Sequence, residues 1–93
     1  MTNALQIIKP HYDAILNDST HTRAAFDAVK AVYQYAGGYT TNVAAHKTLA
    51  EVIAYAKGYI EECFEDEANG DKDAAIERDT MQFILALLEG VSE

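Results

Sequence analysis

The stretch from Glu61 to Glu67 is the most acidic part of this sequence. It reads Glu-Glu-Cys-Phe-Glu-Asp-Glu, with five acids in seven residues. Carboxylates bind cations, either Lys and Arg side chains of a partner protein or divalent metal ions. On a helix, Glu61 would face Glu65 and Glu62 would face Asp66, and each pair of like charges costs a few tenths of a kcal/mol. Local physics therefore disfavours this run, and a binding partner that neutralises it would explain it.

The residues that continue the run resemble the calcium-binding loop of an EF-hand. Oxygen ligands fall at the odd loop positions from 1 to 9, and Gly70 stands at position 6. Two positions depart from the pattern: Ile76 replaces the acid at position 12, and Lys72 replaces an apolar residue at position 8. The resemblance implies an alternative function, divalent-cation (calcium) binding by a helix-loop-helix over residues 65–77. Its candidate metal ligands are Glu65, Glu67, Asn69, Asp71, Asp73 and Glu77.

Other residue types that carry chemistry lack suitable neighbours. Cys63 falls on an apolar helix stripe beside carboxylates, which disfavours a thiolate, so we expect a structural thiol. The three histidines, His11, His21 and His46, have no metal-ligand spacing, and the sequence has no glycine-rich phosphate loop. We therefore expect a protein that is not an enzyme, with no cofactor and no catalytic residues.

Tyrosines near the middle of the chain are candidates for contacts with a partner. Tyr35, Tyr39 and Tyr55 fall off the predicted apolar stripes, and aromatic side chains at the rim of a core are enriched in interfaces. We add them to a partner-binding set that also contains acidic residues. The acidic members are Glu51, Glu61, Glu62, Glu65 and Asp66.

Small residues form a separate ridge on the same predicted helix. Ala50, Ala54 and Gly58 recur every four residues and face away from the apolar stripe. A glycine inside a helix costs roughly 0.5–1 kcal/mol relative to alanine. The ridge therefore predicts close approach by another backbone, either a helix of this chain or a second subunit in a homo-oligomer.

The elements that must position these residues are helices. Apolar residues recur at helical spacing, and Thr22, Gly37 and the Asn69-Gly70 pair provide start and stop signals. Pro10 is best placed in a first turn, so the first helix begins either before it or at it. We predict an all-α fold, a compact bundle of three to four antiparallel helices in one domain over residues 1–93. The predicted helices span 3–17 or 10–17, 22–36, Thr40 or Thr41 to 68, and 71 or 73 to 89.

Each predicted helix has an apolar face that we expect to be buried. In the first it comprises Leu5, Ile8, Tyr12, Ile15 and Leu16, and in the second Ala25, Phe26, Val29, Val32, Tyr33 and Ala36. In the third it comprises Leu49, Val52, Ile53, Ala56, Tyr59, Ile60, Cys63 and Phe64, and in the fourth Ile76, Thr80, Phe83, Ile84, Leu87 and Leu88.

Composition and charge limit the classes of partner. The net charge is -8, and residues 47–93 carry twelve acids against four bases, whereas residues 1–46 carry three of each. This sign opposes direct binding to nucleic acid or to anionic membranes and favours a basic protein surface. One cysteine fits a reducing cytoplasm, and no apolar run is long enough to span a membrane.

These observations favour a small acidic protein-binding module. We expect an inhibitor or regulator that docks an acidic helix face, within residues 51–67, onto a basic surface of a partner. If that surface normally holds DNA or RNA, the helix would act as a nucleic-acid mimic. In size and charge the chain is similar to phage-encoded inhibitors of restriction and CRISPR systems, although no motif carries this likeness. A structural oligomer subunit without a ligand is a further alternative.

Overall fold

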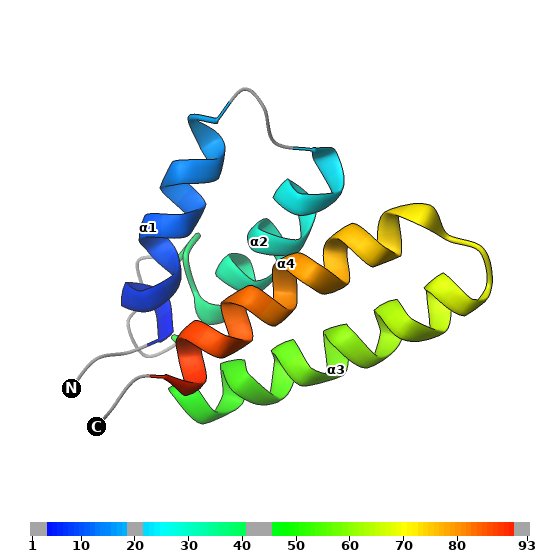
Figure 1. The fold of residues 1–93 in the computed structure, drawn as a ribbon. Helices are drawn as coiled ribbons and strands as arrows, with labels where there is room; N and C mark the ends of the chain where they lie inside the picture. The colour runs from blue at the N-terminus through cyan, green and yellow to red at the C-terminus, as the bar shows by residue number, and fades with distance from the viewer. Residues whose placement is uncertain (1–3, 19–21, 41–45, 91–93) are drawn as a thin grey trace.

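Four helices account for most of the residues that the structure describes. The structure is a computed structural model, and it describes residues 4–18, 22–40 and 46–90. Within these ranges it contains α1 (Ala4–Leu16), α2 (Arg23–Ala36), α3 (Leu49–Ala68) and α4 (Lys72–Glu89), and no strand (Figure 1). The predicted all-α class is confirmed.

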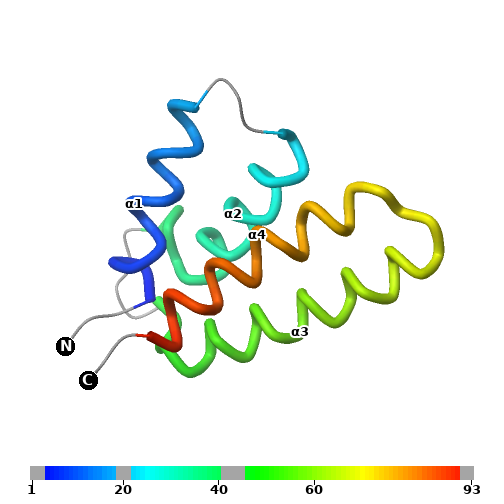
Figure 2. The backbone as a smooth tube through the Cα atoms, in the orientation of Figure 1, coloured from blue at the N-terminus to red at the C-terminus, as the bar shows by residue number. Residues whose placement is uncertain are grey.

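The helices are arranged as two antiparallel pairs. α3 and α4 form a hairpin with the most extensive contact in the molecule, while α2 packs against both α1 and α4 (Figures 1 and 2). By contrast, α1 and α4 touch each other little. The predicted bundle is therefore present, but α1 and α4 are in much looser contact than the α3–α4 and α1–α2 pairs.

Several predicted helix ends are confirmed. The Thr22 side chain accepts a hydrogen bond from the Ala25 N–H at 3.2 Å, and this caps the start of α2. Gly37 ends α2 with φ 108°, a left-handed conformation that favours glycine. At the next turn, Gly70 has φ 97° and Asp71 caps α4 by accepting from the Asp73 N–H at 3.0 Å.

The start of α3 differs from the prediction. Residues 46–48 are not helical, and α3 begins at Leu49 rather than at Thr40, while Thr41 lies outside the described residues. Thr48 and Glu51 form a capping box, in which each side chain satisfies the backbone N–H of the other. This Thr-x-x-Glu spacing is visible in the sequence, but the apolar stripe taken alone extends the predicted helix past it.

Pro10 lies inside α1 rather than at its start, so the longer predicted helix is closer to the structure. Proline removes one helical hydrogen bond and crowds the preceding turn. Its side chain is exposed, and so are its neighbours Lys9 and Gln6. On this side of the helix, water can reach the carbonyl that loses its donor.

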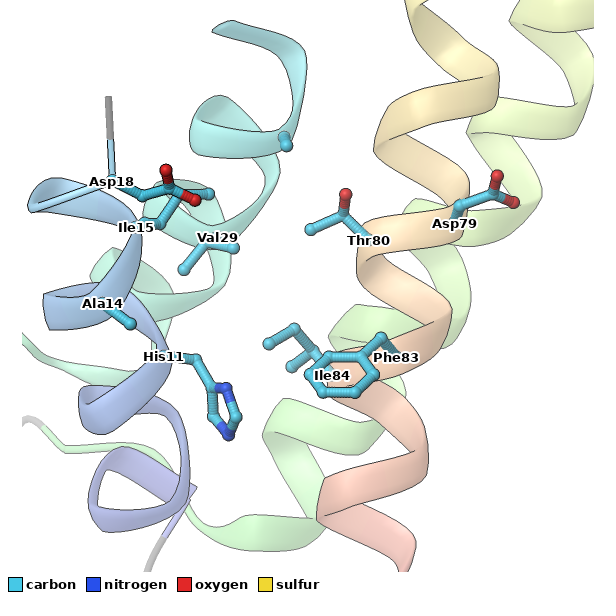
Figure 3. A pocket seen from close by; sticks show the side chains of 10 residues that line it. His11, Ala14, Ile15, Asp18, Val29, Asp79, Thr80, Phe83 and Ile84 are labelled. Carbon is cyan, nitrogen blue, oxygen red and sulfur yellow. The ribbon is translucent and has the colours of Figure 1, made fainter. Parts of the chain in front are cut away.

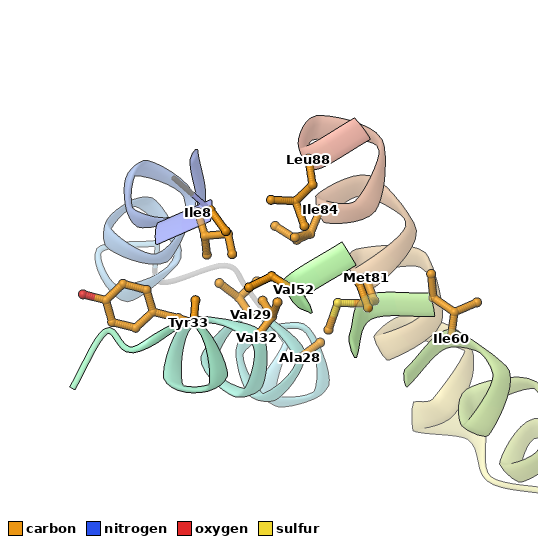
Figure 4. Packing of buried hydrophobic residues seen from close by; sticks show 13 residues of the cluster. Ile8, Ala28, Val29, Val32, Tyr33, Val52, Ile60, Met81, Ile84 and Leu88 are labelled. Atoms are coloured by element: carbon orange, nitrogen blue, oxygen red, sulfur yellow. The ribbon is translucent and has the colours of Figure 1, made fainter. Parts of the chain in front are cut away.

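The hydrophobic core lies where all four helices meet. Its largest fully buried side chains are Ile8, Val32, Val52, Met81, Ile84 and Leu88 (Figure 4). In α3, the predicted stripe is buried at Val52, Ala56, Ile60 and Cys63. Two predicted core residues are instead half exposed, namely Leu16 in α1 and Phe64 in α3.

The register of α4 is the main correction to the predicted core. The structure buries Ala74, Met81, Ile84 and Leu88. Ile76 and Phe83 are 37% and 56% exposed. The fourth helix carries two apolar stripes. Ile84 and Leu88 are buried as predicted, but packing against α2 and α3 buries Ala74 and Met81 with them, in place of Ile76 and Phe83.

Candidate functional site

Four carboxylates of α3 project into solvent. Glu61, Glu62, Glu65 and Asp66 are all exposed. None of them forms an ion pair with a Lys, Arg or His in the described ranges. We call these four residues the acidic face of α3. They are the residues whose repulsion the sequence predicts, and the described part of the fold brings no cation to neutralise them.

Most other carboxylates of the described chain have a partner within it. The ion pairs are Lys9–Asp13, Arg23–Asp27, Lys57–Glu89, Arg78–Glu67 and Arg78–Asp79. Lys57 illustrates the contrast, because it lies one turn before Glu61 but reaches across to Glu89 of α4 at 3.7 Å. These cations are therefore directed away from the acidic face.

Glu51 and Glu67, which flank the acidic face, have structural roles. Glu51 belongs to the capping box at the first turn of α3, at the opposite end of the helix from Asp66. Glu67 pairs with Arg78, whose guanidinium also lies 5.0 Å from the centre of the Phe64 ring. Glu51 therefore lies apart from the other acids of the predicted partner-binding set. The ion pair with Arg78 offsets the cost of a negative charge at Glu67, near the end of the helix.

The helix end makes the remaining charge unfavourable. The last turn of α3 contains no basic residue. Its final carbonyls carry the negative end of the helix dipole, which costs an exposed anion roughly 0.3–1 kcal/mol. Backbone N–H groups of Asn69 and Asp71 satisfy the carbonyls of Glu65 and Asp66, so the backbone is capped although the side chains are not.

The predicted tyrosine anchors fall into two clusters. Tyr35 of α2 stacks on Tyr55 of α3, with ring centroids 4.2 Å apart. Burial, and then the negative charge of Glu62, raise the pKa of the Tyr55 hydroxyl, which places this cluster beside the acidic face. Tyr39 instead shares a 2.8 Å hydrogen bond with Tyr12, and these two residues belong to the second cluster.

A shallow pocket lies on α3 at the small-residue ridge. Ala50, Ala54 and Gly58 are all exposed, and a Cβ atom built on Gly58 would meet nothing within 4 Å. The pocket has a volume of about 300 Å³, and Tyr55 and Glu62 form part of its wall. No described helix of the chain approaches Gly58, so contact with a second subunit stays a prediction.

The predicted calcium loop is not formed. α3 remains helical as far as Ala68, through the first positions of the proposed loop. Glu67 is paired with Arg78, Asp71 caps α4, and Glu77 accepts a hydrogen bond from the Tyr59 hydroxyl at 3.3 Å. Among the residues that the structure describes, no group of three or more His, Cys, Asp or Glu side chains is arranged to hold a metal ion. Three of the six candidate ligands, Glu65, Glu67, Asn69, Asp71, Asp73 and Glu77, thus have other partners in the structure, and cation binding over residues 65–77 stays a prediction.

Cys63 lies on the inner side of α3, where it is buried as predicted. Burial raises the pKa of its thiol to about 11, and the carboxylates of Glu77, Asp66 and Glu62 add to this effect. The thiolate is the nucleophilic form of cysteine. The thiol is therefore almost entirely protonated at neutral pH, which fits a structural role.

A groove that the sequence did not reveal lies between α1 and α4, with α2 as its floor. It has a volume of about 490 Å³ (Figure 3). Val29 of α2 and Ile84 of α4 line its inside, and the rings of His11 and Phe83 meet edge to face at 5.4 Å across one end. We call this feature the α1–α4 groove. The only signal in the sequence is the second apolar stripe of α4, which periodicity alone assigns to the core.

Comparisons with known proteins add no assignment. No protein-family model matches the chain, and no curated protein or solved structure matches it significantly. Within the described ranges, no helix combines the length and the apolar composition that a membrane span requires.

Proposed function

We propose that this protein is a binding module that docks the acidic face of α3 onto a basic surface of a partner protein, as an inhibitor or regulator. Glu61, Glu62, Glu65 and Asp66 supply the charge, and Tyr55, supported by Tyr35, supplies an adjacent aromatic contact. If the partner surface normally binds DNA or RNA, the docked helix acts as a nucleic-acid mimic.

The observation that carries the proposal is the contrast between the acidic face and the other acids. Nearly every other described carboxylate pairs with a cation, caps a helix or accepts a hydrogen bond. The four on α3 repel one another beside a helix C-terminus without such compensation. A tolerated local cost of this kind is typical of residues that are kept for an interaction.

The arrangement also fits the chemistry of such an interaction. Four carboxylates within two turns of helix present a dense row of acceptors to Arg and Lys side chains, and Arg can bind a carboxylate through two parallel hydrogen bonds. Exposed charges of one sign accelerate association with a partner of opposite sign. Because salt screens such interactions, the affinity should fall as the ionic strength rises.

The test is affinity capture from a lysate of the source cells at about 50 mM and about 150 mM salt. The bait is the wild-type protein or the variant Glu61→Gln/Glu62→Gln/Glu65→Gln/Asp66→Asn. We expect the wild type to retain a basic partner at low salt, to lose much of it at high salt, and the variant to retain none. The captured partner is then purified and its affinity measured directly.

A matched control separates the acidic face from net charge. The variant Asp13→Asn/Asp27→Asn/Asp73→Asn/Glu89→Gln removes the same number of charges from exposed or half-exposed positions on α1, α2 and α4. It should retain the partner. Equal loss of binding in both variants would reduce the effect to overall charge, and full retention by the α3 variant would refute the proposal.

A further inference from the structure

The pocket on the outer side of α3 is lined by two tyrosines, two small residues and one acid. They are Tyr55, Tyr59, Ala54, Gly58 and Glu62. A Cβ atom built on Gly58 would meet nothing within 4 Å, so a side chain at this position would extend into open space. The volume of about 300 Å³ is at the lower end of the range of roughly 300–1,000 Å³ in which proteins bind ligands. This feature, which we call the Gly58 pocket, therefore suits a single side chain of a partner.

The two aromatic side chains of the pocket are held in place by other helices. Tyr55 stacks on Tyr35 of α2, with ring centroids 4.2 Å apart. The Tyr59 hydroxyl donates a hydrogen bond to Glu77 of α4 at 3.3 Å. The rings of Tyr55 and Tyr59 lie 6.2 Å from each other. Side chains that are already fixed lose little conformational freedom when a ligand binds, so the pocket is preorganised.

The chain places a cation of its own on the same aromatic stack. The Nζ atom of Lys47 lies 5.5 Å from the centre of the Tyr35 ring, and that ring stacks on Tyr55. Such contacts are favourable because the face of an aromatic ring carries negative electrostatic potential. No Lys or Arg is among the described residues that line the Gly58 pocket, beside Tyr55. A cation from a partner would supply there what Lys47 supplies at Tyr35.

Glu62 gives the pocket a carboxylate without a cation. It is exposed and forms no ion pair within the described ranges. Its charge contributes, after burial, to the raised pKa of Tyr55, which places it close to that hydroxyl. Lys57, the residue before Gly58, instead reaches Glu89 of α4. An apolar side chain in the pocket would remove water from this carboxylate without compensation, whereas a cation would pair with it.

Arginine of another protein is the cation that fits these groups best. A guanidinium is planar, so it can stack on an aromatic ring and bind a carboxylate through two parallel hydrogen bonds, whereas the ammonium of lysine is a compact point charge. The chain has two arginines, Arg23 and Arg78, and each forms an ion pair within it. A second copy would also bring a net charge of -8 to an acidic surface. The arginine therefore comes from a basic partner.

We propose that the Gly58 pocket receives one arginine side chain of the basic partner protein. The guanidinium stacks on Tyr55 and pairs with Glu62, while the aliphatic part of the side chain lies over Ala54 and Gly58. This inference rests on the proposed function, because the acidic face of α3 brings the partner to the pocket. It adds a preference for arginine over lysine, which attraction between opposite charges does not provide.

The probes for the test are two short peptides of equal charge. One is a capped oligolysine peptide, and the other is the same peptide with one central Lys replaced by Arg. Binding is measured by NMR titration at about 50 mM salt, where contacts between charges persist. We expect both peptides to bind and the arginine peptide to bind about threefold more tightly, as a cation over an exposed ring predicts. The arginine peptide should also shift the ring resonances of Tyr55 and Tyr59 more strongly.

Two variants test the pocket, each with a matched control. Gly58→Leu fills the pocket and should abolish the preference for arginine. Ala50→Leu adds the same side chain to an exposed position of the same ridge outside the pocket, and should preserve it. Glu62→Gln should reduce the preference, whereas Glu61→Gln removes the same charge from an exposed neighbour outside the pocket and should not. Circular dichroism verifies that each variant is folded.

Three outcomes would overturn this inference. The first is equal affinity of the wild type for the two peptides, or no binding of either. The second is an unchanged preference for arginine in Gly58→Leu. The third is a dimer that Gly58→Leu abolishes, since this would identify a second copy as the occupant. Equal affinity that the four-residue α3 variant removes would leave the proposed function standing. That function fails separately if the α3 variant retains the captured partner.

Discussion

The outer faces of α3 and α4 each break an ordinary rule of surface composition, in opposite ways. α3 presents four carboxylates that no cation of the described chain neutralises, whereas α4 presents the apolar side chains of Ile76 and Phe83, which the described helices cover only in part. The first feature follows from the sequence alone. The second appears only after the helices are packed, because it depends on which of two apolar stripes of α4 faces the core.

The sequence thus predicts uncompensated charge and buried apolar faces with different success. Like charges four residues apart repel on any helix, whatever the helix packs against. An apolar stripe, by contrast, does not by itself predict burial, because it can form part of the core or of a binding surface. Substitutions on each outer face should therefore affect stability very differently from substitutions in the core beneath it.

The strongest predicted effect distinguishes the two stripes of α4. Met81 is fully buried, so Met81→Ala should lower the free energy of unfolding by about 2–5 kcal/mol. Phe83 is half exposed, so Phe83→Ala should cost less than about 1 kcal/mol. Urea unfolding of both variants measures the difference. Equal costs would mean that Phe83 belongs to the core, as the sequence pattern suggests.

The next effect concerns the inner face of α3 and its pH dependence. Because burial raises the pKa of Cys63 from 9 to about 11, the stabilisation from its neutral thiol is complete below pH 9 and is lost as the pH rises through 11. The loss amounts to about 2 kcal/mol. Unfolding experiments from pH 8 to 11 should show a decline that is shallower in Cys63→Ala. Tyr59 and Tyr55, whose pKa values burial also raises, contribute to the decline that remains.

An identical pH profile in Cys63→Ala and the wild type would contradict this role of the thiol. Tyr59→Phe provides the complementary control, because it keeps the ring and removes the titrating hydroxyl. Thiol labelling offers an independent measurement. Cys63 should react slowly at neutral pH in the folded protein and much faster in urea.

A smaller effect of opposite sign is expected on the outer face of α3. Neutralising Glu61, Glu62, Glu65 and Asp66 should raise the free energy of unfolding by about 1 kcal/mol at low salt, because it removes repulsion and unfavourable dipole contacts. Added salt should shrink this gain through screening. A variant that is less stable than the wild type would show that the four carboxylates have structural partners.

The smallest effect probes the ridge beside the acidic face. Gly58→Ala should stabilise the protein by roughly 0.5–1 kcal/mol, because the added methyl group meets open space and alanine favours the helix. Thermal unfolding measures the gain. If sedimentation shows a dimer in the wild type and a monomer in Gly58→Ala, the ridge is an interface between copies, as the sequence predicts.

Much of the fold could be predicted from local signals. Thr22, Gly37, Asp71 and Gly90 mark helix ends that the structure reproduces, since caps depend on neighbours along the chain. The capping box marks the start of α3 equally well, although the apolar pattern favours an earlier start. Of the predicted partner-binding acids, Glu51 belongs to this capping box. Glu67, at the end of the acidic run, acquires its partner Arg78 only when the α3–α4 hairpin forms.

Interactions within a few residues are enough to specify the helices, most of their ends and the uncompensated charge of α3, so the sequence alone predicts these features. Tertiary packing was needed to select the buried stripe of α4, to bring Glu67 to Arg78 and to leave a groove between α1 and α4. The reason is that a helix presents all its faces at once. Its neighbours in space, which periodicity does not specify, select the face that becomes core.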